Sequence, residues 1–219
     1  ETIRMSVGGN EQNFTLSGDW DKIKKENVTA VANTINVNTY GGATARTIYL
    51  WGAQLEQGSY ATSYIPTSGT SVTRNQDVCT NGGSLASINS TEGVLYAEIA
   101  ANSNDLTNRV ISLSDGTTAN RVSIVLGNIS NQIRGQVLSS GTSFDFSTTS
   151  YDPLNINKIA ISYKLNDFKM YVNGVEVATD TSGNSPIGMN ELSFNVGSDI
   201  LPFYGKTKAL AVWKEALSD

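Results

Sequence analysis

Short runs of alternating apolar and polar residues dominate the second half of the chain. The first, residues 94–100, follows Glu92-Gly93 and has the two-residue period of a β-strand. The same period predicts further strands at residues 109–114, 121–126, 132–137, 158–163, 168–172, 175–177, 191–197 and 206–214. At least eight strands in this span are enough to bury a core between two antiparallel sheets. The pattern therefore predicts an all-β fold with a β-sandwich, or jelly roll, over residues 68–219.

One turn in this region has a specific signature. Asn173-Gly174 separates two alternating runs, and this dipeptide supplies the positive φ angles of a two-residue type I′ turn. We therefore expect a β-hairpin at this position.

The first 67 residues form a different unit. Strands are predicted at residues 2–7, 13–16, around Trp20 and Ile23, and at 34–38 and 46–55. Five strands in so short a span make a poor closed sandwich, because one sheet face lacks a partner. We therefore expect the native polypeptide to begin upstream of Glu1, with Trp20 and Trp51 in the core of the unit.

A linker follows this unit. Residues 64–71 combine Pro66 with small polar residues, a composition typical of connecting segments. The predicted domains are therefore residues 1–67, part of a sandwich, and residues 68–219, a complete one.

Composition and charge disfavour several classes of function. Only 16% of the residues are charged and the net charge is -5, which disfavours binding to a phosphate backbone, so nucleic acid is not an expected partner. No apolar stretch reaches the 18 to 20 or so residues that cross a bilayer, and membrane insertion is not expected. Cys79 is the only cysteine, which excludes an intrachain disulfide and predicts a small strand residue.

The residues needed for hydrolysis are missing. The chain has no histidine, which excludes Ser-His-Asp and Cys-His nucleophile systems and zinc sites with histidine ligands. The paired acids of a glycosidase are not found on any predicted strand. Four acids, Glu98, Asp145, Asp152 and Glu176, each stand alone, and Tyr163 and Tyr171 lack the Arg, Gln and His set of a polysaccharide lyase. We therefore expect no enzyme activity.

Carbohydrate binding requires an aromatic platform with nearby polar groups. Phe144, Phe146 and Tyr151 cluster in a polar segment that we interpret as an irregular loop, and Tyr204 follows Pro202 in a second segment. These four residues are the predicted carbohydrate-binding residues, with packing as the alternative for each. Trp213 shares a strand face with Ala209 and Ala211, opposite Leu210 and Val212, which favours a core or inter-domain position.

Calcium remains open as a structural cofactor, because its preferred ligands are carboxylate and carbonyl oxygens. Loop residues that offer such oxygens are Asp115, Asn120, Asp180, Asn184 and Asp199. Ordinary turn chemistry is the alternative for all five, and no other cofactor is predicted.

Two stretches resemble known families. Residues 49–67, which contain Trp51-Gly52-Ala53-Gln54-Leu55-Glu56, resemble the closing strand and exit linker of the galactose-binding-like jelly roll of tailed-phage virion proteins. Residues 157–175, with Phe203-Tyr204-Gly205 and Ala216-Leu217-Ser218-Asp219, resemble the concanavalin A-like, laminin-G-like group. The tandem order is similar to that of phage tail fibre and receptor-binding proteins.

This resemblance implies a non-catalytic phage or prophage tail component, located in the virion, that adsorbs to bacterial surface glycans. One alternative is a carbohydrate-binding module of a secreted polysaccharide-degrading enzyme, and another is a purely structural spacer of a tail fibre. Because single sugar contacts are weak, a homo-oligomer such as a trimer is expected to raise avidity.

Overall fold

The structure is a computed structural model that describes residues 2–26, 28–29, 34–39, 47–58, 60–75 and 82–216. Every regular element in these ranges is a β-strand, so the predicted all-β class is confirmed. Within the same ranges, no helix has the length and apolarity that crossing a bilayer requires. Cys79 lies outside the described residues.

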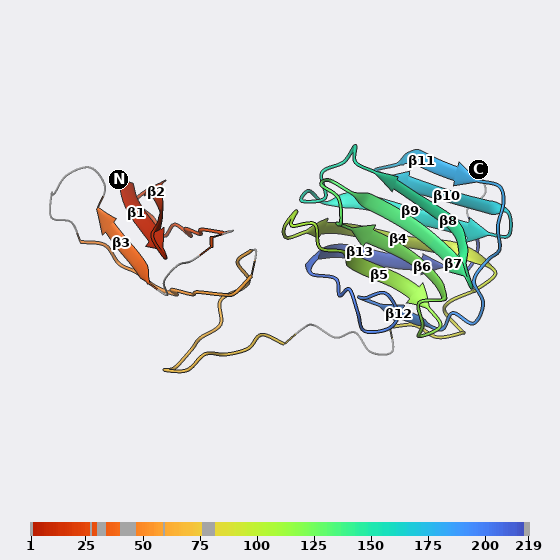
Figure 1. The fold of residues 1–219 in the computed structure, drawn as a ribbon, viewed down its shortest axis with the longest axis horizontal. Helices are drawn as coiled ribbons and strands as arrows, with labels where there is room; N and C mark the ends of the chain where they lie inside the picture. Colours follow the sequence, from red (N-terminus) through yellow and green to blue (C-terminus); the bar gives the residue numbers. More distant parts are fainter. Residues whose placement is uncertain are drawn as a thin grey trace. The chain divides into compact units, whose positions relative to one another are not determined.

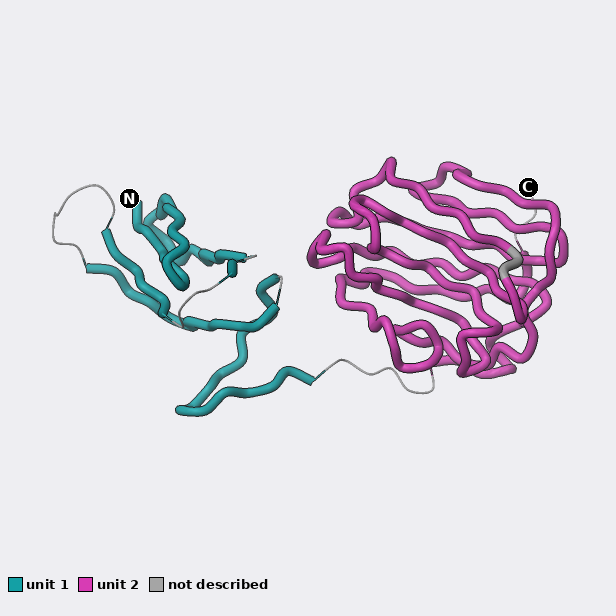
Figure 2. Tube along the Cα trace, viewed as in Figure 1, with its two compact units in different colours: residues 1–75 teal, residues 76–219 magenta. Residues whose placement is uncertain are grey.

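The chain divides into two compact units, residues 1–75 and residues 76–219, which are described separately (Figure 2). The sequence predicted a boundary at residues 67 and 68.

The second unit is a sandwich of two antiparallel five-stranded sheets (Figure 1). One sheet has the order β11-β10-β9-β4-β13 and the other has the order β12-β5-β6-β7-β8. The strands are β4 (Glu92–Ala101), β5 (Arg109–Ser114), β6 (Asn120–Leu126), β7 (Ile133–Ser139), β8 (Thr142–Thr148), β9 (Asn157–Lys164), β10 (Asp167–Val172), β11 (Val175–Asp180), β12 (Glu191–Ser193) and β13 (Gly205–Trp213).

The core lies between these sheets and follows from the alternation in the sequence. On β4, Leu95, Ala97 and Ile99 point inward, and on β9 Ile159, Ile161 and Tyr163 do the same. Their strand neighbours point to the outer face, because successive side chains of a strand alternate. Inward residues of both sheets thus form one continuous apolar core.

The predicted hairpin is confirmed. Asn173 and Gly174 have φ angles of 54° and 83° and connect β10 to β11. This geometry is the one that an Asn-Gly type I′ turn requires.

The prediction of an irregular loop at residues 144–151 is wrong for residues 144–148, while residues 149–151 lie outside the strands. Residues 142–148 form β8, which pairs with β7 in register Gly135↔Phe146 and Gln136↔Asp145. Phe144 and Phe146 alternate with polar residues, so the segment carries the period of a strand that is half buried.

The first unit contains one three-stranded sheet of order β2-β1-β3, with β1 (Thr2–Val7), β2 (Asn10–Thr15) and β3 (Ile35–Thr39). Apolar residues of β1 and β3 line an open hollow of about 1000 Å³ together with residues 48–58, 60–62 and 64. Trp20 and Trp51 are 75% and 77% exposed, so their predicted core positions are wrong in this structure. The physical reason is that the described residues provide a single sheet and no second layer to cover the rings.

Candidate functional site

Aromatic rings stand on the outer face of the β11-β10-β9-β4-β13 sheet. Leu95 and Ala97 point into the core, so Tyr96 between them points outward. Leu210 and Val212 pack against the core, and Trp213 therefore shares the outer face with Ala209 and Ala211. The sequence prediction that Trp213 shares a face with the two alanines is confirmed, but that face is the outer one and Trp213 is 46% exposed.

The strand register places these rings around small side chains. Tyr96 on β4 pairs with Ala160 on β9 and with Ala211 on β13. Ala160 pairs in turn with Tyr171 on β10. Tyr96 and Tyr171 are therefore two strands apart, about 10 Å, with only the methyl group of Ala160 between them. We call the surface made by Tyr96, Ala160, Tyr171, Ala211 and Trp213 the aromatic face.

The rings of the aromatic face are held by their neighbours. The Trp213 ring meets the Tyr96 ring edge to face, with 6.1 Å between centroids and 70° between planes. The hydroxyl of Tyr171 donates a hydrogen bond to Glu176 Oε2 at 3.1 Å. These contacts fix the orientation of amphipathic rings that remain partly open to solvent.

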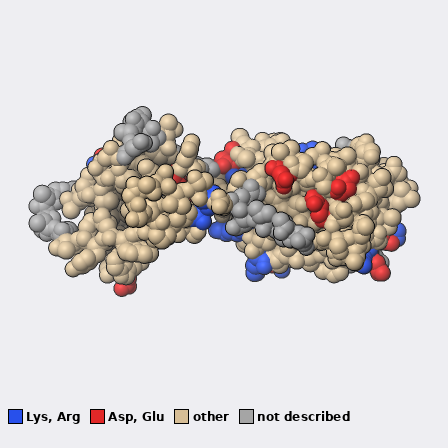
Figure 3. Space-filling model, turned by 90° about the horizontal axis from the view of Figure 1, so that it is seen from below, with Lys and Arg blue, Asp and Glu red and all other residues tan. Residues whose placement is uncertain are grey.

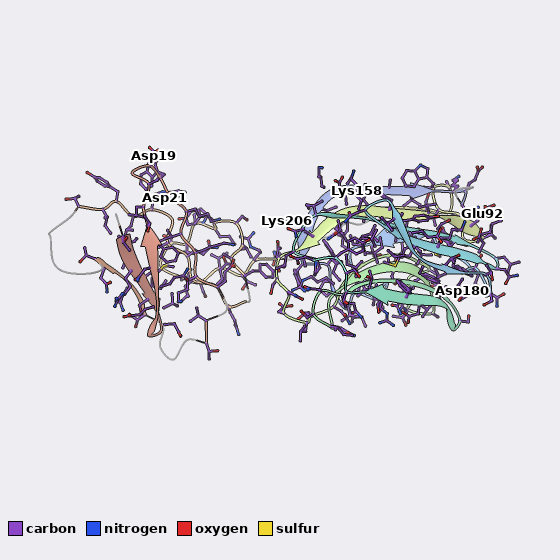
Figure 4. The ribbon with its side chains drawn as sticks, turned by 90° about the horizontal axis from the view of Figure 1, so that it is seen from above. Asp19, Asp21, Glu92, Lys158, Asp180 and Lys206 are labelled. Atoms are coloured by element: carbon purple, nitrogen blue, oxygen red, sulfur yellow. The ribbon has the colours of Figure 1, made fainter. Side chains whose placement is uncertain are left out.

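Polar groups border the aromatic face. Ser162 and Lys169 face each other across β9 and β10 in the row next to Ala160 and Tyr171. In the row on the other side, Glu98 accepts a hydrogen bond from Lys208 Nζ at 3.0 Å and pairs across the strands with Lys158. Figure 4 shows Lys158 and Lys206 near one end of the sandwich, and Glu92 and Asp180 near the opposite end. Apolar ring faces with hydroxyl and charged groups beside them can bind a pyranose ring through its C–H face and its hydroxyl groups.

Two acids singled out in the sequence are held in ion pairs, and one tyrosine is buried. Glu98 is bonded to Lys208, and Asp145 is bonded to Arg134 on the other sheet. Tyr163 points into the core, donates to the carbonyl of Asn89 at 2.7 Å, and burial raises the pKa of its hydroxyl. A tyrosine that is buried and kept neutral cannot accept a substrate proton near neutral pH.

The four residues predicted to bind carbohydrate occupy different environments. Phe144 is 4% exposed and stacks on Phe168 in the core, with 6.2 Å between the ring centroids. Phe146 and Tyr151 are partly buried and pack against the same core. Tyr204 precedes β13 and is 43% exposed. Of the four, Tyr204 is the one that keeps an open ring, while Phe144 has no accessible ring face in this structure.

Four of the five candidate calcium residues make hydrogen bonds in or beside turns. Asp115 accepts hydrogen bonds from Thr117 and Asn120, and Asp180 accepts from Ser182. Asp199 accepts from the side chain of Asn195. In the described part of the chain, no group of three or more acidic, histidine or cysteine residues could hold a metal ion. Calcium therefore stays a prediction without a located site.

Sequence reasoning missed Tyr96 as a site residue and placed Trp213 elsewhere. The alternation of residues 94–100 places Tyr96 on the opposite strand face from Leu95 and Ala97, so the sequence alone could have indicated that Tyr96 points outward. What the sequence could not provide is the pairing of β4 with both β9 and β13, which brings residues 96, 160, 171 and 213 together.

The fold and this outer face define a lectin-like β-sandwich. Residues 73–219 match the family described as the concanavalin A-like lectin/glucanases superfamily. The chain belongs to this superfamily. The curated proteins contain no match to the chain.

Solved structures with a similar fold include carbohydrate-binding domains. The CBM40 domain of the Ruminococcus gnavus IT-sialidase, bound to alpha2,3-sialyllactose, is 15% identical, with a TM-score of 0.50 over 59% of this chain and 79% of that one. Domain 4 of a Geobacillus stearothermophilus GH43 extracellular arabinanase, in complex with arabinotriose, is 17% identical, with a TM-score of 0.46 over 60% of this chain and 64% of that one. A Bacillus licheniformis β-glucanase is 17% identical, with a TM-score of 0.44 over 57% and 67%. At these identities the likeness concerns the fold alone.

Proposed function

We propose that the second unit is a non-catalytic carbohydrate-binding module, of the kind attached to secreted enzymes that degrade polysaccharides. The observation that carries this proposal is the aromatic face, where Tyr96, Tyr171 and Trp213 surround the small side chain of Ala160. The superfamily membership of residues 73–219 supports it, as does the likeness to a sialidase CBM40 domain bound to a sugar. This function was the first alternative drawn from the sequence.

The aromatic face suits a neutral sugar chain rather than a compact charged ligand. The surface between its rings is made of alanine side chains, and of the charged groups that border it Glu98 and Lys208 are paired with each other. Figure 3 shows one side of the molecule, on which acidic and basic side chains of both signs stand among mostly uncharged residues. A shallow surface with apolar rings at its centre is expected to bind several sugar units weakly.

Adsorption of a phage or prophage tail to host glycans remains a second proposal for the same chemistry. It depends on the resemblance of residues 49–67 and on the tandem order, and none of the matches described above is a virion protein. Sequencing the parent gene and its neighbours separates the two: an adjoining polysaccharide-degrading domain favours the module, and adjoining virion genes favour the tail protein. A trimer, measured by light scattering, would favour clustered presentation in either setting.

The test of glycan binding compares exposed aromatic residues. The complete chain is applied to an array of neutral polysaccharide fragments, and binding is then titrated for Trp213→Ala, Tyr171→Ala and Tyr204→Ala. Loss of a stacked ring at the aromatic face is expected to weaken binding at least about fivefold, whereas Tyr204→Ala leaves it unchanged.

Two results would count against this assignment. If Tyr204→Ala abolishes binding while Trp213→Ala does not, the sugar binds beside Tyr204 and the aromatic face is the wrong site. If no neutral fragment binds while the thermal midpoint shows a folded chain, the aromatic face is not a site for neutral sugars; if acidic oligosaccharides also fail to bind, the carbohydrate-binding function itself is wrong and the architectural alternative is favoured.

A further inference from the structure

Charged and polar residues occupy the outer face of the opposite sheet. Val122 and Ile124 of β6 point into the core, so Arg121 and Ser123 point outward. Ser123 pairs with Gln136 on β7, and Gln136 pairs with Asp145 on β8. Arg134 stands on β7 two residues before Gln136, on the same outer face. We call the surface made by Arg121, Ser123, Arg134, Gln136 and Asp145 the arginine face.

Arg134 has its partner within this face. Its Nε donates to Asp145 Oδ1 at 2.7 Å and its Nη2 donates to Oδ2 of the same carboxylate. Gln136 Nε2 donates to Asp145 Oδ2 at 3.2 Å. The hydrogen bonds from Arg134 lower the pKa of Asp145, so the carboxylate is ionised at neutral pH. In this pair a planar guanidinium binds a carboxylate through two parallel hydrogen bonds, which is the geometry in which an arginine binds an anion.

Arg121 has no carboxylate partner of this kind. Its Nη1 donates to the backbone carbonyl of Thr118, while its Nε is buried and has no hydrogen-bond partner. Burial and, to a smaller extent, the neighbouring Arg134 lower its pKa. In the adjacent row, Ser123 is fully buried and its hydroxyl has no partner in the structure. The one carboxylate of this face thus hydrogen-bonds Arg134, and the guanidinium of Arg121 beside it is left without an anionic hydrogen-bond partner among the described residues.

A neighbouring segment borders the arginine face. Ser112 Oγ on β5 donates to the carbonyl of Asn195 at 2.7 Å. Val196 packs against Val110 and Val125 on the outer side of β5 and β6. Residues 195–196 therefore cover the outer side of β5, and the part of the sheet left open is the part that carries Arg121, Arg134 and Asp145.

We propose that Arg121 binds the carboxylate of an acidic sugar, at a site on the opposite sheet from the aromatic face. The proposal rests on the proposed function only for its ligand class, a glycan. A planar guanidinium matches a carboxylate through two parallel hydrogen bonds, and Asp145 makes this interaction with Arg134 next to the site. The module accordingly has one face for neutral sugar rings and one for uronic or sialic acid residues.

The experiment compares acidic probes with their own methyl esters. Hexagalacturonate and sialyllactose are titrated calorimetrically into the complete chain at low ionic strength, beside the esters that keep the sugar ring and lack the charge. At least one acid is expected to bind about tenfold or more tightly than its ester, and Arg121→Gln to remove this preference. Arg121→Lys keeps the positive charge but loses the planar guanidinium, so this variant should retain part of the preference for the acid.

Lys206→Gln is the matched control, since it removes one positive charge from the opposite sheet and should leave the preference unchanged. The thermal midpoint of each variant reports whether it is folded. The proposal is wrong if neither acid binds better than its ester, or if folded Arg121→Gln keeps the full preference. Equal binding of a carrageenan oligosaccharide would overturn the assignment to carboxylates in favour of sulfate.

Binding of neutral fragments is measured in the same variants. If Trp213→Ala loses this binding and Arg121→Gln keeps it, the neutral and the acidic sugars bind at two distinct sites.

Discussion

Phe144 has its ring between the two sheets, stacked on Phe168 and 4% exposed. Removing the ring leaves a cavity that the surrounding strands cannot fully close. We expect Phe144→Ala to lower the free energy of unfolding by about 3–5 kcal/mol, measured by chemical denaturation. Tyr204→Ala, at an exposed aromatic position, is expected to change it by less than about 0.5 kcal/mol. A small loss for Phe144→Ala would contradict the packing role.

The Arg134 and Asp145 pair predicts a dependence of stability on pH. The pKa of Asp145 is lowered in the folded state, chiefly by hydrogen bonds from Arg134. Its contribution is therefore present above the unfolded carboxyl pKa of about 4 and is lost as the pH falls through the lowered folded value. Because both side chains are nearly one-third exposed, at 28% and 30%, we expect less than about 1 kcal/mol.

Denaturation of the parent chain and of Asp145→Asn at pH 7 and pH 2.5 measures this contribution. The stability difference between the two should shrink at the lower pH. The same comparison made in an Arg134→Gln background should show a smaller difference at pH 7. A difference that stays constant with pH would show that the pair is not the cause.

At the residue scale, the sequence indicated which side chains share a strand face, but not which face is buried. Trp213 was grouped correctly with Ala209 and Ala211, yet both sides of that strand carry apolar residues, so the pattern did not distinguish inside from outside. Arg121, Gln136 and Asp145 are up to 24 residues apart, and three-strand pairing brings them together. Such groupings depend on register, which one sequence specifies only weakly.

The β10–β11 hairpin is the element whose local sequence determines it most directly. Gly174 has a φ of 83°, a region in which a Cβ atom clashes with its own backbone. No other atom lies within 4 Å of the Cβ that a side chain would add, so backbone strain is the expected cost. Gly174→Ala is expected to lower the free energy of unfolding by about 1–2 kcal/mol.

Gly141 offers a matched control, because it lies between β7 and β8, lacks a positive φ, and also has open space around its Cβ position. Gly141→Ala should cost less than Gly174→Ala in the same thermal or chemical unfolding series. Equal costs would mean that loss of glycine itself, and not the left-handed turn, sets the effect.

Nine predicted strands of the sandwich correspond to strands in the structure, and β8 was missed. The reason lies in composition: Ser and Thr surround Phe144 and Phe146, which suggested a loop although the period of two was present. The opposite error occurred at residues 191–197, where β12 ends at Ser193. There, Val196 continues the apolar pattern because it packs on the outer side of the sheet, against Val110 and Val125.

At the scale of the whole molecule, the two units differ in how well they bury apolar side chains. The sandwich has a continuous core, whereas Trp20 and Trp51 of the first unit are largely exposed. The segment of residues 61–75, at the end of the first unit, contains no strand, and Arg74 in it is exposed. Trypsin cleaves after Lys and Arg, and in the sandwich every basic residue except Lys214, which follows β13, lies in a strand.

Limited trypsin digestion of the complete chain should therefore yield a resistant product that begins at Asn75, because backbone in an exposed segment without strand pairing reaches the protease most easily. Mass spectrometry identifies the product, and its thermal unfolding should remain cooperative. Arg74→Gln should slow its formation. Since both the aromatic face and the arginine face belong to the sandwich, the product should bind the same sugars as the complete chain. A product cut inside β4–β13 would contradict the independence of this unit, and a folded product that has lost binding would show that the first unit contributes to recognition.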